Sequence, residues 1–167
     1  VIAGYGHAPE HASLYCEALG VLIAGDMVLP KISTNVSVRP VEPDGDQLGR
    51  FLESLTRFAA LPQETLVLPS HGLPFRGIRT RIAQLQAHHA ERLETLRAAC
   101  IEPRSACELV PVLFRRTLDD RAWYFAMGEC IAHLNRLLYA GQLERIEGAD
   151  GVLRFRVCDA PRAAAAA

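Results

Sequence analysis

Lysine, long apolar runs and paired cysteines are all scarce in this sequence. Lys31 is the one lysine among 18 basic residues, which 19 acidic residues offset to a formal net charge of −1. This balance gives no general attraction to nucleic acid or to an anionic membrane. The longest apolar runs, about seven residues, fall short of the ~20 that a membrane helix needs, and no signal peptide opens the chain. We therefore expect a soluble, cytoplasmic protein without a membrane partner.

The five cysteines are odd in number, scattered along the chain and without a C-x-x-C pair. Most of them lie within apolar helix or strand patterns, so we expect reduced thiols in the core or at the surface. Such cysteine usage fits a cytosolic compartment.

The chain is long enough to bury a core. Its 167 residues, half of them hydrophobic, could form one domain or two small ones. It starts at Val1 rather than at a methionine, within a strand-like stretch, and it ends in an alanine run, residues 163–167. Both ends suggest a fragment of a longer polypeptide.

Three strand-like apolar runs each end beside a glycine and a potential metal ligand. The runs cover residues 1–3, 20–24 and 65–69, and the ligands that follow them are His7, Asp26 and His71. Glycine lets the backbone turn sharply at each of these points. Because strand ends of one sheet can converge in space, imidazole and carboxylate groups far apart in sequence can hold a divalent ion. The pattern therefore predicts a metal site at these strand ends.

The motifs G-H-x-P-x-H at residues 6–11, G-D at 25–26 and S-H-G at 70–72 resemble the later metal motifs of the metallo-β-lactamase fold hydrolases. The resemblance continues through a helix after His71 and a C-terminal unit similar to the winged-helix domain of one branch of that superfamily. It implies an α/β (α+β) fold, the C-terminal half of a four-layer αββα sandwich followed by a small winged-helix domain. The family's first motif, H-x-H-x-D-H, is absent from this chain, so half of the expected metal site is missing.

The resemblance also implies a dinuclear metal centre. His7 would complete the ligands of a first ion, His71 those of a second, and Asp26 would bridge both as the catalytic carboxylate. Two Zn²⁺ ions suit such His-rich ligation, although Fe or Mn would be tolerated. In the complete enzyme, hydroxide on the two ions would attack an ester, thioester, amide or phosphodiester of a small-molecule substrate. His11 occupies the position that in this family supports the site rather than binding metal.

A long loop rich in hydroxyl and amide groups, residues 27–40, starts beside Asp26. Loops in such places usually carry specificity. We expect this loop either to face the substrate through Lys31, Ser33 and Asn35, or to be a plain connector. The resemblance gives the other histidines no ligand role, and packing or solvated positions are expected for His88, His89 and His133.

Hydrophobic periodicity predicts the order of helices and hairpins. The expected elements are a hairpin over residues 12–25, a helix from 47 to about 61, a helix over about 78–100, a helix over 106–114, a helix from 121 to about 139, and a hairpin over 143–157. A break at residues 102–104 precedes a capping box, Ser105 with Glu108. We place a hydrolase-like domain at 1–102, a winged-helix-like domain at 103–158 and a tail at 159–167.

The C-terminal unit has the charge balance of a partner-contacting module rather than of a DNA reader. Between residues 103 and 157, eight Arg meet seven Asp and Glu, and its long helix carries only Arg121 and Arg136. This argues against sequence-specific DNA binding. The cluster Trp123, Tyr124, Phe125 and Met127 is instead expected to pack against the hydrolase-like domain or a second subunit, which would make a homodimer.

Two functions of different classes stay open. The chain is part of a metal-dependent hydrolase, an RNA-processing nuclease being one form of it, or it is a catalytically incomplete fragment that serves as a structural or binding module. Each ion would have two protein ligands here, one of them shared, whereas a catalytic zinc normally has three plus water. We therefore expect this chain alone to bind metal weakly or not at all and to be inactive.

Overall fold

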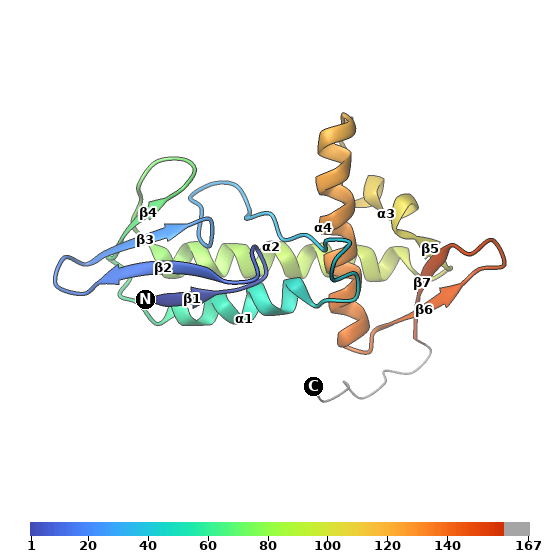
Figure 1. Cartoon of the computed structure of the whole chain (residues 1–167), viewed down its shortest axis with the longest axis horizontal. Coiled ribbons are helices and arrows are strands. Elements are labelled where there is room, and N and C mark those ends of the chain that lie inside the picture. The colour runs from blue at the N-terminus through green and yellow to red at the C-terminus, as the bar shows by residue number, and fades with distance from the viewer. Residues whose placement is uncertain (159–167) are drawn as a thin grey trace. The chain divides into compact units, whose positions relative to one another are not determined.

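A computed structural model describes residues 1–158, which form a mixed α/β structure in two compact units (Figure 1). The first unit comprises residues 1–36 and 47–89, and the second comprises residues 37–46 together with the chain from residue 90 onward. The mixed α/β class expected from the sequence is confirmed. The division expected after residue 102 concerns domains rather than packing units and stays a prediction, and the expected tail at 159–167 lies outside the described residues.

The first unit is built on a four-stranded sheet. Its strands are β1 (Ile2–Gly4), β2 (His11–Cys16), β3 (Val21–Gly25) and β4 (Leu66–Pro69), in that spatial order. The first three strands pair antiparallel, and β3 pairs parallel with β4. A parallel pair needs a crossover, and helix α1 (Gln47–Ala59) lies in the connection between β3 and β4. The predicted hairpin over residues 12–25 is present, with Leu14 opposite Ile23.

The two faces of this sheet differ sharply in burial. On one face Ser13, Leu22, Ala24 and Val67 are fully buried, and the unit's other large buried side chains come mainly from α1 and the first half of α2 (Ile78–Ala99). We call the opposite face the outer face. It carries no charged side chain, and its residues are Ala3, Ala12, Leu14, Cys16, Val21, Ile23, Leu66 and Leu68. Leu14 and Ile23 are each 50% exposed, so large apolar groups of this face meet water.

The second unit combines helices with a three-stranded sheet. Its elements are β5 (Arg104–Ser105), α3 (Ala106–Leu113), α4 (Asp120–Tyr139), β6 (Leu143–Glu147) and β7 (Leu153–Val157), and the sheet has the order β5-β7-β6. The predicted capping box is present, because the Ser105 hydroxyl accepts from the Glu108 N–H while the Glu108 carboxylate accepts from the Ser105 N–H. Asp119 caps α4 by accepting from the Ala122 N–H at 2.7 Å. The two-residue strand β5 was not predicted.

A cluster of buried apolar side chains from α2, α3, α4, β6 and β7 forms the core of the second unit, with Leu96, Leu109, Leu134 and Phe155 among them. The first turns of α4 lie outside this core, because Trp123, Tyr124 and Phe125 are 36%, 64% and 43% exposed. The expected packing of this cluster against the hydrolase-like domain or a second subunit stays a prediction. Across residues 1–158, no helix is both long enough and apolar enough to span a membrane.

The five cysteines are all free thiols, as expected. Cys100 and Cys130 are fully buried in the core of the second unit. Burial raises the pKa of the Cys100 thiol to about 11 and that of Cys130 to about 12, because a thiolate there would lose its hydration. Both groups therefore stay protonated at neutral pH and act as small apolar side chains.

Candidate metal centre

The three predicted ligands lie just beyond three strand ends of the first sheet. His7 follows β1, Asp26 follows β3 directly, and His71 follows β4. Gly6 precedes His7 and has φ at +92°, and Gly25 precedes Asp26 and has φ at +55°. Residues other than glycine rarely adopt these backbone conformations. The chain can therefore turn out of each strand within one or two residues, and the sheet brings the three side chains together.

The Asp26 carboxylate lies between the two imidazoles. Its Oδ2 atom is 3.5 Å from His7 Nε2, and its Oδ1 atom is 3.5 Å from His71 Nε2. Oδ1 is buried and has no hydrogen-bond partner among residues 1–158. A buried carboxylate oxygen without a partner is costly unless another group, such as a cation, compensates its charge.

These distances fit ions placed between the side chains. Metal–ligand bonds of ~2.1 Å at tetrahedral angles hold two ligand atoms ~3.4 Å apart, which is the separation found for each imidazole and carboxylate pair. Each oxygen of Asp26 faces a different histidine, so the two imidazoles approach opposite oxygens of one carboxylate. Within residues 1–158, no group of three or more His, Cys, Asp or Glu side chains could hold a metal ion. Each His–Asp pair therefore comprises two side chains that are potential ligands.

A backbone carbonyl sets the orientation of the His7 ring. His7 Nδ1 lies 2.8 Å from the Asn35 carbonyl oxygen. Because a carbonyl can only accept, Nδ1 carries the proton, and the lone pair of the neutral ring is on Nε2. Nε2 is the atom that points to Asp26, so the hydrogen bond selects the tautomer that binds a metal.

The backbone of Asp26 is held from both sides. Its N–H donates to His11 Nε2 at 3.4 Å, and its carbonyl accepts from the Thr34 hydroxyl. The His11 ring lies so close to Gly25 that a side chain at this glycine would collide with it. His11 is therefore placed beside the backbone turn at Gly25 and Asp26, and its role as a supporting residue stays a prediction.

The loop that follows Asp26 has two kinds of residue. Lys31 is exposed and Ser33 is half-buried, while Thr34 and Val36 are buried. Substrate contacts by Lys31, Ser33 and Asn35 stay predictions. What the sequence did not indicate is the bracing role of Thr34 and of the Asn35 carbonyl. No residue pattern could reveal the second of these, since every residue has a carbonyl.

The other three histidines lie outside this group. His89 and His133 are fully buried, and His89 packs edge-on against Phe51 with ring centroids 5.7 Å apart. His133 Nδ1 lies 2.8 Å from the carbonyl oxygen of Glu129, a residue in the preceding turn of α4. The packed positions expected for these two residues agree with the structure. His88 is half-buried beside His89.

The chain is similar to metallo-β-lactamase domains along most of its length. Residues 1–71 match the metallo-beta-lactamase superfamily, and residues 93–158 match the domain described as metallo-beta-lactamase-like, C-terminal domain. A probable metallo-hydrolase of Bacillus subtilis, YqjP, is 28% identical over 137 residues, which are 79% of this chain and 42% of that protein.

Two solved structures are also similar. A beta-lactamase domain protein from Burkholderia ambifaria is 57% identical with a TM-score of 0.93, covering 95% of this chain and 47% of that one. A metallo-beta-lactamase family protein from Thermus thermophilus is 37% identical with a TM-score of 0.77, covering 92% of this chain and 47% of that one. This chain thus spans less than half the length of each of these relatives. Sequence motifs, strand order and these matches together establish that the chain is a metallo-β-lactamase fold protein.

Proposed function

We propose that this chain carries part of the active site of a metal-dependent hydrolase with two divalent ions. His7 binds one ion, His71 binds the other, and Asp26 bridges them. The observation that carries this proposal is the placement of the two Asp26 oxygens, each 3.5 Å from a different imidazole. A simple ion pair would instead bring one histidine within hydrogen-bonding distance of the carboxylate. Zn²⁺ suits the histidine ligands, and Fe or Mn would be accepted by the mixed donor set.

Divalent ions in such a site supply a nucleophile from water at neutral pH and stabilise negative charge on a carbonyl or phosphoryl oxygen. The chain's own residues orient the ligands. The Asn35 carbonyl keeps the proton on His7 Nδ1, and His11 with Thr34 holds the backbone on either side of the Asp26 carboxylate. Ester, thioester, amide and phosphodiester substrates all fit this chemistry, an RNA phosphodiester among them.

The proposal is tested on the full-length protein by elemental analysis together with a panel of these four substrate classes. We expect two ions per chain and hydrolysis of at least one class, with the rate lost when a chelator removes the metal and restored when Zn²⁺ is added back. A full-length protein that is folded, holds no metal and hydrolyses none of the panel in the presence of Zn²⁺, Mn²⁺ or Fe²⁺ would refute it.

For residues 1–167 alone, we predict weak metal binding. Each position has two ligands from this chain, one of them shared, whereas stable catalytic zinc sites use three. Elemental analysis after dialysis should give well under one ion per chain, and Zn²⁺ titration should give a dissociation constant at least ~100-fold weaker than in the full-length protein. The variant His71→Ala is the matched control, because it should lower the residual binding further. Two tightly held ions in residues 1–167 would contradict this prediction.

A structural or binding role is the second candidate, and the exposed outer face of the first sheet fits either function: a partner would cover it in a binding module, and a second sheet would cover it in a hydrolase. A contiguous apolar sheet face usually marks a surface that another element covers. We propose that a second sheet covers it in the complete enzyme, as a four-layer sandwich requires. The order α2, β5, α3, α4, β6, β7 similarly supports a winged-helix identity for the second unit, whose exposed aromatic cluster would meet a partner or a second copy of the chain.

We predict that the second unit does not bind duplex DNA. Four of its eight Arg between residues 103 and 157 form ion pairs within the chain, and one of them is Arg136, which lies 2.8 Å from Asp46. Paired guanidinium groups release few counterions on contact with phosphates. Fluorescence anisotropy with a random duplex at physiological salt should therefore stay at background. Tight binding that is lost in Arg121→Ala and Arg136→Ala would reverse this conclusion.

A further inference from the structure

The three candidate ligands are not held equally. The His7 ring is bound by the Asn35 carbonyl, and the Asp26 backbone is held on both sides. Within residues 1–158, the His71 ring has one polar contact, the Asp26 carboxylate at 3.5 Å, and the His71 side chain is 67% exposed. The position of His71 therefore depends on what holds the backbone around it.

The backbone around His71 is held by a strand on one side and by a proline on the other. Before it, the Ser70 N–H donates to the Gly25 carbonyl at 3.0 Å, which continues the pairing of β4 with β3. After it, Gly72 lies against the Pro30 ring, because a Cβ added at this glycine would be 2.7 Å from Pro30 Cγ. Pro30 belongs to the long loop after β3. The residue that follows His71 is thus placed by this loop.

Arg81 of α2 holds the loop at that proline. Its Nε–H donates to the Leu29 carbonyl at 2.6 Å, and its Nη2 group donates to the Ile32 carbonyl at 2.8 Å. The Leu29 carbonyl is part of the peptide bond to Pro30, whose ring keeps φ at about −65°. One guanidinium therefore fixes the peptide group directly before Pro30 and also holds the loop just beyond it.

The helix that carries Arg81 is itself anchored within the first unit. Its first half has three buried apolar side chains, Ile78, Ile82 and Leu85. At its start, Arg79 Nε–H donates to the Leu61 carbonyl at 2.9 Å, in the connection before β4. The planar guanidinium of Arg81 keeps its charge at neutral pH, and its fixed fork suits two separate acceptors. Arg81 thus connects the loop to a well-packed helix.

We propose that Arg81 is a positioning residue for His71 at the candidate metal centre. It holds the peptide group between Leu29 and Pro30. Pro30 in turn supports Gly72, which is bonded to His71. All of these residues belong to the first unit. The effect of Arg81 on metal binding rests on the proposed function, whereas its effect on the backbone at Gly72 follows from the contacts and can be measured without metal.

Three variants of the full-length protein test this inference. Arg81→Met removes the hydrogen-bond donors and keeps an apolar stem. Arg81→Lys keeps the positive charge but loses the planar fork that reaches two carbonyls. Pro30→Ala leaves Arg81 in place and removes the ring atoms that lie against Gly72. The third variant therefore tests the next contact of the chain separately from the first.

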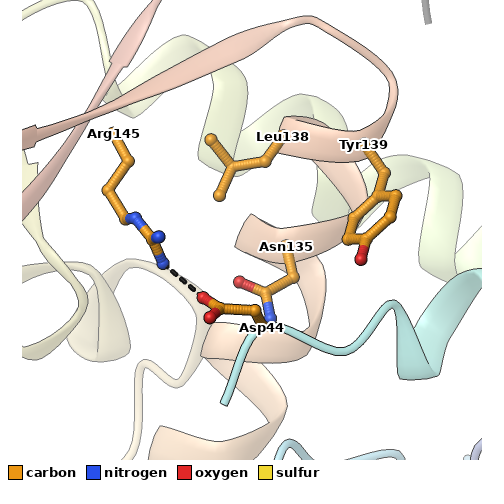
Figure 2. Close-up of a pocket in the computed structure, with 5 residues that line it drawn as sticks. All are labelled: Asp44, Asn135, Leu138, Tyr139 and Arg145. Atoms are coloured by element: carbon orange, nitrogen blue, oxygen red, sulfur yellow. Dashed lines mark hydrogen bonds and ion pairs between the residues drawn. The ribbon is translucent and has the colours of Figure 1, made fainter. Parts of the chain in front are cut away.

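Arg79→Met is the matched control. Like Arg81, Arg79 donates from Nε to a backbone carbonyl, but its acceptor is Leu61 rather than a residue of the loop after β3. Arg145→Met is a second control. Figure 2 shows Arg145 paired with Asp44 at a surface pocket of about 270 Å³, and this ion pair lies within the second unit. Each control removes one arginine and keeps both hydrogen bonds of Arg81.

The first measurement is the stepwise Zn²⁺ affinity by chelator competition, with His71→Ala identifying the binding step that depends on His71. Groups that orient a metal ligand typically contribute 10- to 100-fold, and we expect this step to weaken ~10-fold or more in Arg81→Met and Pro30→Ala. Arg81→Lys should lie between Arg81→Met and the wild type. The other binding step and both controls should stay as in the wild type. Equal weakening of both steps would indicate a general loss of structure and overturn the inference.

The second measurement is NMR of the metal-free protein with isotope-labelled glycine. The Gly72 amide signal should shift in Arg81→Met and in Pro30→Ala, and it should stay unchanged in Arg79→Met and Arg145→Met. An unchanged Gly72 signal in both of the first two variants would overturn the inference even if metal binding fell. If the wild type binds no metal, the proposed function fails, while this signal still decides whether Arg81 places the backbone next to His71.

Discussion

Replacing Asp26 by alanine is expected to abolish hydrolysis by the full-length protein, whereas replacing His11 by alanine should lower the rate only ~10- to 100-fold. The reason lies in what each side chain reaches. The two oxygens of Asp26 approach both His7 and His71, so its loss affects both proposed ion positions at once. His11 meets the backbone N–H of Asp26 and acts on the carboxylate only through it.

The comparison is made on kcat/KM at saturating Zn²⁺, with the metal content of each variant measured in parallel. Asp26→Asn is the sharper control, because it keeps the shape of the side chain and replaces one oxygen with an amide nitrogen that cannot bind a cation. We expect this variant to lose at least one of two ions. Equal rates for Asp26→Ala and His11→Ala at equal metal content would show that Asp26 does not bridge.

Gly6→Ala should be the most destabilising exchange of a glycine for alanine near the centre. At Gly6 the backbone has φ at +92°, and an added Cβ would lie 2.7 Å from Phe51 Cβ and 2.8 Å from the Phe51 backbone nitrogen. Neither the strain nor the collision can be relieved by rotating a flexible side chain. We expect a loss of at least ~3 kcal/mol in the free energy of unfolding, with His7 displaced from Asp26.

Gly20→Ala is the matched control for this prediction. Gly20 also has a positive φ, +60°, but an added Cβ would meet nothing within 4 Å. Strain alone should cost ~1 kcal/mol there, and metal binding should be unchanged. Urea denaturation of both variants separates strain from collision. If the Gly6→Ala protein were as stable as the Gly20→Ala protein, the start of α1 could move away from an added side chain at position 6 at little cost in free energy.

The sequence predicted the helices and the ligand trio because both depend on local patterns. Apolar spacing located α1, α2 and α4, and the capping box located the start of α3 within one residue. The three candidate ligands were proposed because each follows a strand and lies next to a glycine, and their role as ligands stays a prediction. Such signals lie in residues that are close together in the sequence, so they can be recognised without knowledge of the tertiary structure.

What the sequence did not predict are contacts between distant segments. Residues 37–46 pass over Gly128 and accept hydrogen bonds from Asn135, which lies about 90 residues away in the chain. The local sequence around each of these segments gives no sign of the contact with the other. The Asn35 carbonyl that orients His7 is invisible for the same reason. The loop over residues 27–40 was expected to face the substrate or to connect elements, yet Met27, Val28 and Val36 are fully buried within it. Its apolar residues pack because the loop folds back, which periodicity cannot reveal.

The uncharged outer face of the sheet has a thermodynamic consequence. Any partner that covers Leu14, Ile23 and their neighbours removes apolar surface from water and neutralises no charge on this face. Burial of apolar surface gives a negative change in heat capacity and depends little on ionic strength. Contacts between exposed charged side chains, in contrast, weaken as salt is added. Cooling towards 0 °C therefore loosens what this face holds, because the entropic gain from releasing its hydration water becomes smaller. Titration calorimetry of a partner over a range of temperatures would measure this heat-capacity change, and a negative value that depends little on salt would indicate binding to the outer face.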